Sequence, residues 1–148
     1  VLKHDISSMI SIDVEINGEF LTTYQADGLI VNTSTGSTGY ALSVGGPIIV
    51  PGTKIIGMVP VAPHSLTVRP LTFSADAIIR MRVKSRSGNF LLSVDGRSES
   101  SHEDTTITIQ RAPYTVNVLK RSEGSFFHTL RENLMWGADS RERKTDLL

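Results

Sequence analysis

The sequence predicts an all-β fold, most simply a two-sheet β-sandwich with one short helix near the middle and a second helix towards the carboxyl end. Apolar and polar residues alternate in several short segments, which is the two-residue period of half-buried strands. Asn-Gly, Asp-Gly and Pro-containing turns separate these segments, and only the last part of the chain changes to helical spacing. About eight short strands and two short helices are typical of a sandwich.

The first strands are expected to form a hairpin that turns at Asn17-Gly18, because apolar residues occupy every second position from 10 to 16. A two-residue turn would place Phe20 and Tyr24 on the face opposite these apolar residues. A three-residue loop with Gly18 in a left-handed bulge avoids this conflict. We therefore predict the bulged loop, with Val14 opposite Phe20 and Ile10 opposite Tyr24.

The stretch from Ala26 to Pro47 reads A-D-G-L-I-V-N-T-S-T-G-S-T-G-Y-A-L-S-V-G-G-P and predicts a strand, a polar loop and a short helix. Gly36 and Gly39 permit close backbone approach or positive φ. The loop hydroxyls can cap the helix or bond a ligand; they belong to Thr33, Ser34, Thr35, Ser37 and Thr38. Such a loop suits the ribose, amide or phosphate oxygens of a nucleotide, but it lacks the Lys of a Walker phosphate loop.

The remaining segments follow the same pattern of strands and turns. Residues 55–62 form an apolar run whose prolines mark an edge or an exit, and residues 63–70 form a surface turn. Further strands are expected at 77–84, where the basic residues form a solvated face, and at 90–94, 105–110 and 114–120. Residues 98–104 are expected to be a loop, 126–135 a helix, and 141–144 a frayed charged end.

Composition excludes several functions. The 148 residues are expected to form one domain, 1–148, and the 15 basic and 15 acidic residues give no global field for nucleic acid or an anionic membrane. There is no cysteine, no run of about 18 apolar residues, and the four histidines lie in unrelated contexts, so we expect no disulfide, membrane span or metal site. A cytoplasmic location is compatible with this composition. The start at Val1, without an initiator Met, suggests a fragment of a longer protein.

The order of the residues in the central stretch resembles the signature of the NAD kinases. The matching residues are A-D-G-L-I-V followed by T-x-T-G-S-T-x-Y-x-L-S-x-G-G-P. Two later segments, Pro63–Leu71 and Ser93–Arg97, fit the same family in the same order. The resemblance covers nearly the whole chain and points to the carboxyl-terminal NAD-binding β domain of these enzymes.

The resemblance implies that the full-length protein phosphorylates the 2′-hydroxyl of the adenosine ribose of NAD, giving NADP, with ATP or polyphosphate as donor. The family places a Gly-Gly-Asp-Gly-Thr segment in an amino-terminal α/β domain and an Asn-Glu or Asn-Asp pair before the β domain. Neither motif occurs in this sequence. We therefore expect no catalytic residue in this chain, no kinase activity from the chain alone, and binding of Mg²⁺ and the phosphoryl donor mainly by the missing domain.

The resemblance also implies which residues bind NAD: Asp27, Thr38, Gly39, Tyr40, Ala41, Leu42, Ser43, Ala62, Asp95 and Arg97. Asp95 is expected near the nicotinamide carboxamide, and Ala62 is expected to act through its main chain in oligomers. Gly39 replaces the usual Ala, and Gln25 stands where Arg is frequent, which puts an ionic contact to phosphate in doubt. Without the motifs, Asp27 and Asp95 would be read as turn residues that bond their own backbone.

Two other functions fit parts of the pattern. A lipid kinase of the diacylglycerol or sphingosine type shares the domain plan, although the T-G-S-T-G-Y-A-L-S segment favours a nucleotide substrate. A β-sandwich that binds a protein or glycan and catalyses nothing is the alternative from a different class. A homo-oligomer, dimer or tetramer, is also expected, with Ile55–Met58 and Ala62 completing the NAD site of a neighbouring subunit.

Overall fold

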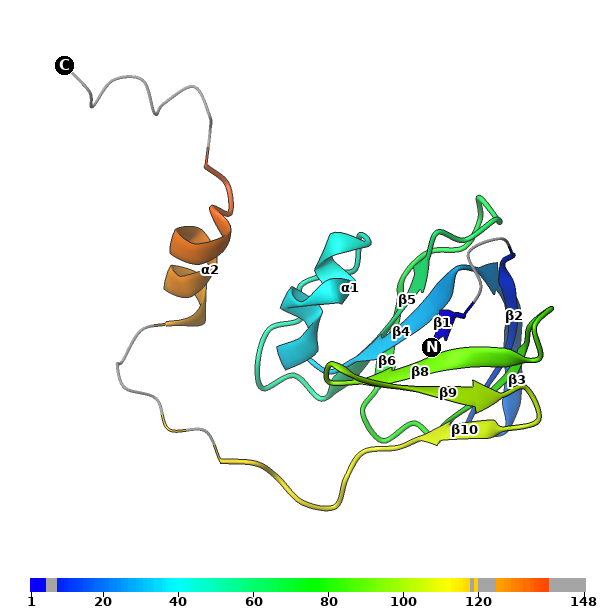
Figure 1. Ribbon diagram of the computed structural model, residues 1–148. Coiled ribbons are helices and arrows are strands. Elements are labelled where there is room, and N and C mark those ends of the chain that lie inside the picture. Colours follow the sequence, from blue (N-terminus) through cyan, green and yellow to red (C-terminus); the bar gives the residue numbers. More distant parts are fainter. Residues whose placement is uncertain (5–7, 118, 120–124, 139–148) are drawn as a thin grey trace. The chain divides into compact units, whose positions relative to one another are not determined.

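The computed structural model describes residues 1–4, 8–117, 119 and 125–138. The chain divides into two compact units, Val1–Pro113 and Tyr114–Leu148. The first unit contains ten strands in two antiparallel sheets, with a 3₁₀ turn and a short helix between β4 and β5 (Figure 1). The structure therefore confirms the prediction of an all-β, two-sheet fold with two helices.

The strands of the larger sheet lie in the order β6-β5-β4-β1-β8-β9, and those of the smaller sheet in the order β10-β7-β2-β3. The bounds of the elements are β1 (Leu2–Lys3), β2 (Ile10–Ile16), β3 (Glu19–Ala26), β4 (Gly28–Asn32), η1 (Thr35–Thr38), α1 (Tyr40–Ser43), β5 (Ile55–Val61), β6 (Leu71–Ser74), β7 (Ile79–Lys84), β8 (Asn89–Val94), β9 (Arg97–His102), β10 (Thr106–Ile109) and α2 (Phe126–Leu134). The helix α1 follows the polar loop and α2 lies near the carboxyl end, as predicted.

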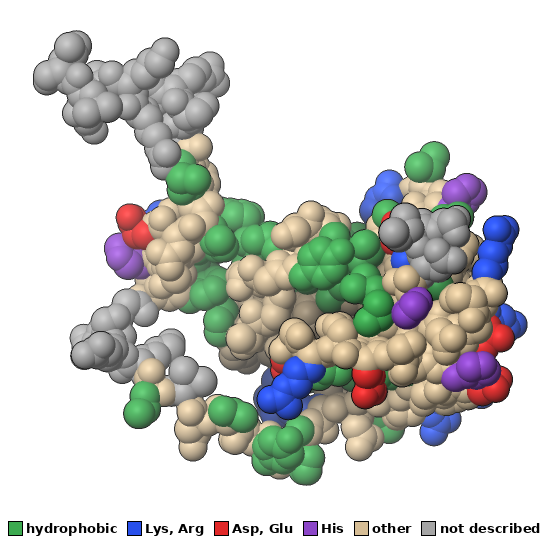
Figure 2. Space-filling model, in the orientation of Figure 1, with side chains coloured by type: hydrophobic (Ala, Val, Ile, Leu, Met, Phe, Trp, Pro, Cys, Tyr) green, Lys and Arg blue, Asp and Glu red, His purple; other side chains and the backbone are tan. Residues whose placement is uncertain are grey.

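The core lies between the facing sides of the two sheets. On β7 the apolar residues are buried and the three basic residues alternating with them are exposed, which confirms the prediction of a solvated basic face. Figure 2 shows charged side chains on the side of the first unit where Figure 1 places β2 and β3. Both sheets contribute to the core, whose buried members are Ile10, Ile12, Val14, Tyr24, Leu29, Ile56, Met58, Ile79, Met81, Val83, Phe90 and Ile107.

The hairpin between β2 and β3 differs from the predicted bulged loop. Asn17 and Gly18 both have positive φ, 54° and 84°, so they form a two-residue turn with Ile16 opposite Glu19. The irregularity lies instead within β3, at Leu21, between the pairs Glu15–Phe20 and Val14–Thr22. This extra residue brings Tyr24 opposite Ile12 and into the core, while Phe20 stays 60% exposed. The predicted pairs Val14–Phe20 and Ile10–Tyr24 are therefore wrong.

The apolar run at β5 is explained by burial on both faces. Ile56 and Met58 belong to the core between the sheets, and Val59, on the other face, lies beside Gly46 in the connection after α1. Strand β5 lies between β4 and β6 rather than at an edge. Pro60 is tolerated because β6 pairs only with residues 55–58, so β5 has no neighbour on that side at Pro60.

Two other predictions fail in the described residues. Residues 98–102, part of the loop predicted at 98–104, instead belong to the edge strand β9, because the two-residue turn Asp95-Gly96 returns the chain to pair with β8 from Arg97 to His102. Tyr114–Asn117, predicted as a strand, has no regular structure. Residues 118 and 120 and the predicted frayed end at 141–144 lie outside the described part of the chain.

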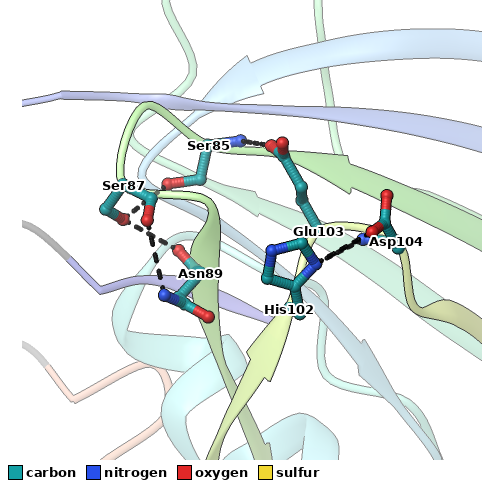
Figure 3. A network of polar contacts seen from close by, with 6 residues as sticks. All are labelled: Ser85, Ser87, Asn89, His102, Glu103 and Asp104. Atoms are coloured by element: carbon teal, nitrogen blue, oxygen red, sulfur yellow. Dashed lines mark hydrogen bonds and ion pairs between the residues drawn. The ribbon is translucent and has the colours of Figure 1, made fainter.

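A polar network joins the two connections that cross between the sheets at one end of the sandwich (Figure 3). In the connection from β7 to β8, the backbone N–H of Ser85 donates to the Glu103 carboxylate (3.2 Å), and Glu103 N–H donates to the Gly88 carbonyl (2.9 Å). His102 Nδ1 lies 3.2 Å from the Asp104 carboxylate in the connection from β9 to β10. The two bonds of Glu103 hold the two crossing connections together.

The second unit contributes one described helix, α2. Ser125 caps it, because its Oγ accepts a hydrogen bond from the His128 N–H (3.1 Å), and Met135 ends it in the left-handed conformation. This confirms the helix predicted at residues 126–135.

Candidate functional site

A cavity of about 660 Å³ lies where the end of β4, the polar loop and the turn between β8 and β9 meet. Its apolar lining comes from residues 1–2, 30–31 and 40–41. Its polar lining comes from Asn32, Thr33, Thr35, Ser93 and Asp95. Figure 2 shows hydrophobic side chains exposed beside α1 in this region. An apolar floor with a few convergent polar groups is the usual composition of a small-molecule site.

The loop that forms one wall is a 3₁₀ turn, Thr35–Thr38, followed directly by α1. The predicted side-chain capping is absent: neither Ser34 nor Gly39 caps these elements through a side chain. Gly36 and Gly39 do not have positive φ; a Cβ at either position would lie 3.3–3.4 Å from Asn32 or from the Gly36 carbonyl. Close backbone approach is therefore what these glycines provide.

Ser37 fastens the loop to the segment after α1. It is fully buried, and among the described residues it is the single polar residue that is buried as a whole. Its Oγ donates to the Ser34 carbonyl (2.6 Å) and accepts a hydrogen bond from the Ile49 N–H (3.0 Å). This hydroxyl is thus used within the protein and is not available to a ligand.

Gly46 makes a second close contact in the same wall. Its N–H donates to the Ala41 carbonyl (2.8 Å), and a Cβ at Gly46 would lie 2.7 Å from that oxygen and 2.9 Å from Val59. No side chain fits there without a shift of backbone.

Four of the predicted site residues line the cavity together: Gly39, Tyr40, Ala41 and Asp95. The Tyr40 ring is 55% exposed. Asp95 and Gly96 both have positive φ, 47° and 81°, in the two-residue turn between β8 and β9. Among the described residues no hydrogen bond engages the Asp95 carboxylate, so the alternative in which it bonds its own backbone is not observed.

Two predicted residues lie at the opposite end of β4. The Asp27 carboxylate pairs with Lys3 Nζ (2.7 Å), and the Asp27 N–H donates to the Val61 carbonyl (2.9 Å), which places the neighbouring Ala62 at the same end. Ala62 has φ 45°, an uncommon backbone conformation for a residue other than glycine. Five strand residues at ~3.3 Å each separate Asp27 from Asn32 by about 16 Å. Leu2, which pairs with Gly28, is the lining residue nearest to this end of β4 in the sheet.

The other predicted residues do not line the cavity. Thr38, Leu42 and Ser43 lie on η1 and α1 next to it, and the Thr38 hydroxyl donates to the Thr35 carbonyl (3.4 Å). Arg97 begins β9 and lines a separate depression of about 210 Å³ with Glu99. Gln25, at the position where Arg is frequent, donates to the Ser11 hydroxyl (2.9 Å).

Asn32 is a cavity residue that the sequence interpretation missed. Its Nδ2 donates to the Thr33 carbonyl (3.0 Å), while its Oδ1 is buried without a hydrogen-bond partner. It stands opposite Gly57, where a Cβ would lie 2.9 Å from Oδ1. The signal in the sequence was an amide side chain at the end of an apolar strand, directly before the polar loop. Ser93 was also missed, because it looked like an ordinary strand residue.

Among the described residues, no group of three or more His, Asp or Glu side chains is arranged to hold a metal ion. In the same described part of the chain, no helix has the length and apolar character needed to cross a membrane.

The family model described as the ATP-NAD kinase C-terminal domain matches residues 1–121. An NAD kinase of Bacteroides fragilis is 60% identical over 141 residues, which are 95% of this chain and 49% of that protein. An NAD kinase of Porphyromonas gingivalis is 46% identical over 138 residues, covering 93% of this chain and 48% of that protein. The chain thus spans about half the length of the curated relatives it matches.

Two solved structures share the fold. A yeast NADH kinase complexed with NADH has a TM-score of 0.78 and 29% identity, with 93% of this chain and 43% of that chain covered. An NAD kinase from Archaeoglobus fulgidus in complex with ATP has a TM-score of 0.68 and 29% identity, with 76% of this chain and 43% of that chain covered. By its sequence match over residues 1–121, and by a fold that these enzymes share, the chain belongs to the ATP-NAD kinase C-terminal domain family.

Proposed function

We propose that residues 1–148 act as one domain, the NAD-binding domain of a kinase that phosphorylates the 2′-hydroxyl of the adenosine ribose of NAD to give NADP. The cavity carries this proposal, because family-matched residues from the polar loop and from the β8–β9 turn meet there. Its volume of about 660 Å³ is within the range for small-molecule sites, ~300–1,000 Å³. The NADH in the related yeast structure supports a dinucleotide as the substrate.

The family-matched residues in and beside the cavity have roles that fit their chemistry. The exposed ring of Tyr40 packs against a base, and the Gly39–Ala41 backbone faces the nucleotide at close range. The free Asp95 carboxylate accepts a hydrogen bond from the nicotinamide carboxamide. The hydroxyls of Thr38 and Ser43 form hydrogen bonds with the nucleotide at the edge of the cavity.

The two predicted residues at the far end of β4 belong to a second half of the site. Because Asp27 and Ala62 do not line the cavity, and Asp27 lies about 16 Å along β4 from Asn32, we assign these two residues to the nucleotide bound by a neighbouring copy. The unusual φ of Ala62 supports a functional role for its backbone. The proposal therefore requires a homo-oligomer, a dimer or a tetramer.

Catalysis of phosphoryl transfer is assigned to residues outside this chain. The chain holds and orients NAD, while Mg²⁺ and the phosphoryl donor, ATP or polyphosphate, bind mainly to another domain of the protein. The ATP in the related archaeal structure supports ATP as the donor. Arg97, Leu42 and a cytoplasmic location stay predictions from the sequence.

The direct test is a kinase assay on the full-length protein. Incubation with Mg²⁺, either NAD or NADH, and either ATP or polyphosphate should form NADP or NADPH, measured with a coupled dehydrogenase. Diacylglycerol and sphingosine are the alternative acceptors in the same assay. Phosphorylation of a lipid without formation of NADP would favour the lipid-kinase alternative, and calorimetric titration without NAD binding would favour a non-catalytic module.

A further inference from the structure

The wall of the cavity contains a buried polar contact that is separate from the groups facing the nucleotide. The Ser37 hydroxyl bridges the Ser34 carbonyl, just before η1, and the Ile49 N–H, which lies 12 residues further along the chain than Ser37. The backbone N–H of Ser37 also donates to the Thr33 carbonyl (3.0 Å). One residue therefore connects both sides of the polar loop to the segment that follows α1.

This contact lies against the end of β4. Ile49 is buried, and its Cδ1 lies 3.2 Å from the position of a Cβ at Gly57, which stands opposite Asn32. Residues 47–50 form no regular strand or helix, so sheet hydrogen bonds do not hold Ile49 in place. The bond to Ser37 is what satisfies its buried N–H.

We infer that Ser37 is a positioning residue for the nucleotide: its hydroxyl fixes the wall formed by Thr35, Gly36 and Gly39–Ala41 without touching the ligand. This inference rests on the proposed function of the cavity. In Ser37→Ala the Ile49 N–H loses its acceptor in a buried site, and the loop loses its connection to that segment. The loop then samples other positions in the free protein and must be ordered when NAD binds. This ordering lowers the affinity for NAD and leaves the binding of the phosphoryl donor unchanged.

The test compares wild type, Ser37→Ala and Ser37→Thr in the full-length protein. The removal of a buried hydrogen-bond acceptor predicts a rise of about tenfold in the KM and Kd for NAD in Ser37→Ala, with the KM for ATP and kcat little changed. Hydrogen exchange at the Ile49 amide reports the bond without any catalysis. Across the three proteins, stronger protection of the Ile49 amide should accompany a lower KM for NAD. Ser37→Thr should therefore regain both the protection and the low KM if its hydroxyl restores the bond.

Two control variants separate positioning from loss of stability. Val83→Ala removes buried methyl groups from β7, outside the cavity lining, and should lower stability without changing the KM for NAD. Thr53→Val removes a hydroxyl bond to the Val50 carbonyl (2.7 Å) in the same connection and should also leave this KM unchanged.

The outcomes are distinct. An unchanged affinity for NAD in Ser37→Ala, an equal rise in Val83→Ala, or a raised KM in Ser37→Thr with the Ile49 amide protected would each overturn the inference but not the proposed function. A wild-type protein that binds no NAD would overturn both.

Discussion

Replacement of Gly46 by Ala should weaken NAD binding, because Gly46 contacts the cavity residue Ala41 without itself lining the cavity. The added Cβ would lie 2.7 Å from the Ala41 carbonyl oxygen, where ordinary contact begins at 3.4 Å, so backbone must move by several tenths of an ångström. Ala41 lines the cavity, and the same carbonyl accepts the Gly46 N–H. Overpacking of this kind costs about 1–3 kcal/mol.

This cost gives two measurable effects. In a domain of this size a loss of 1 kcal/mol lowers Tm by about 4 °C, so thermal unfolding should shift down by about 4–12 °C. Displacement of the Ala41 carbonyl also distorts the wall of the cavity, and about 1.4 kcal/mol of lost binding free energy would appear as a tenfold rise in the KM for NAD. Steady-state kinetics of the full-length protein, with NAD varied and ATP fixed, measures the second effect.

The neighbouring glycine supplies a matched control. Gly45 has φ 84°, so Gly45→Ala is strained by about 1–2 kcal/mol, but a Cβ there meets nothing within 4 Å. The two variants should therefore lose similar stability, while only Gly46→Ala raises the KM for NAD. Equal KM values in the two variants would refute the argument that the Ala41 carbonyl sets the shape of the cavity.

Three further predictions concern the carboxylates, assembly and the isolated chain. Asp95→Asn should weaken NAD binding by about 1.5–3 kcal/mol in calorimetric titration, with no change in Tm, because the Asp95 carboxylate has no partner to lose among the described residues of the folded protein. Asp27→Asn should weaken NAD binding and also lower the free energy of unfolding by up to about 1 kcal/mol, because its pair with Lys3 is lost. An unchanged KM for NAD in both variants would mean that these carboxylates serve only their turns. The full-length protein should give the mass of a dimer or tetramer in light scattering at micromolar concentration, and a monomer with intact NAD affinity would contradict cross-subunit completion of the site. The 148-residue chain alone should form no detectable NADP, because the loss of a general base costs ~10²–10⁴ in rate and donor alignment is lost as well; turnover near that of an intact kinase would mean that a catalytic group lies within this sequence.

Alternation predicted most strands, because a strand packed on one face leaves a two-residue period that local sequence records. Strand β7 is the clear case, with buried apolar and exposed basic residues. Strand β9 was missed since it has exposed residues on both faces and depends on β8 for its pairing, which is information outside the segment. The position of the bulge at Leu21 was missed for a related reason: the turn type and the burial of Tyr24 compete, and only the complete sheet decides between them.

The candidate site, too, was predictable from the sequence only in part. Tyr40, Gly39, Ala41 and Asp95 were identified through a family motif, and they meet at one cavity. The separation of Asp27 and Ala62 from this cavity could not be read from their spacing, because it depends on the direction in which β4 crosses the sheet. Ser37 looked like any other hydroxyl of the loop, and only its burial and its bond to Ile49 distinguish it.

The irregularity at Leu21 has a consequence for assembly. Strand β3 is one of the two edge strands of the smaller sheet, and an edge strand with exposed Phe20 would otherwise offer backbone groups to a strand of another molecule. The extra residue breaks the regular spacing of those donors and acceptors and increases the local twist. The irregularity therefore opposes continuation of the sheet along β3 by a strand of another molecule.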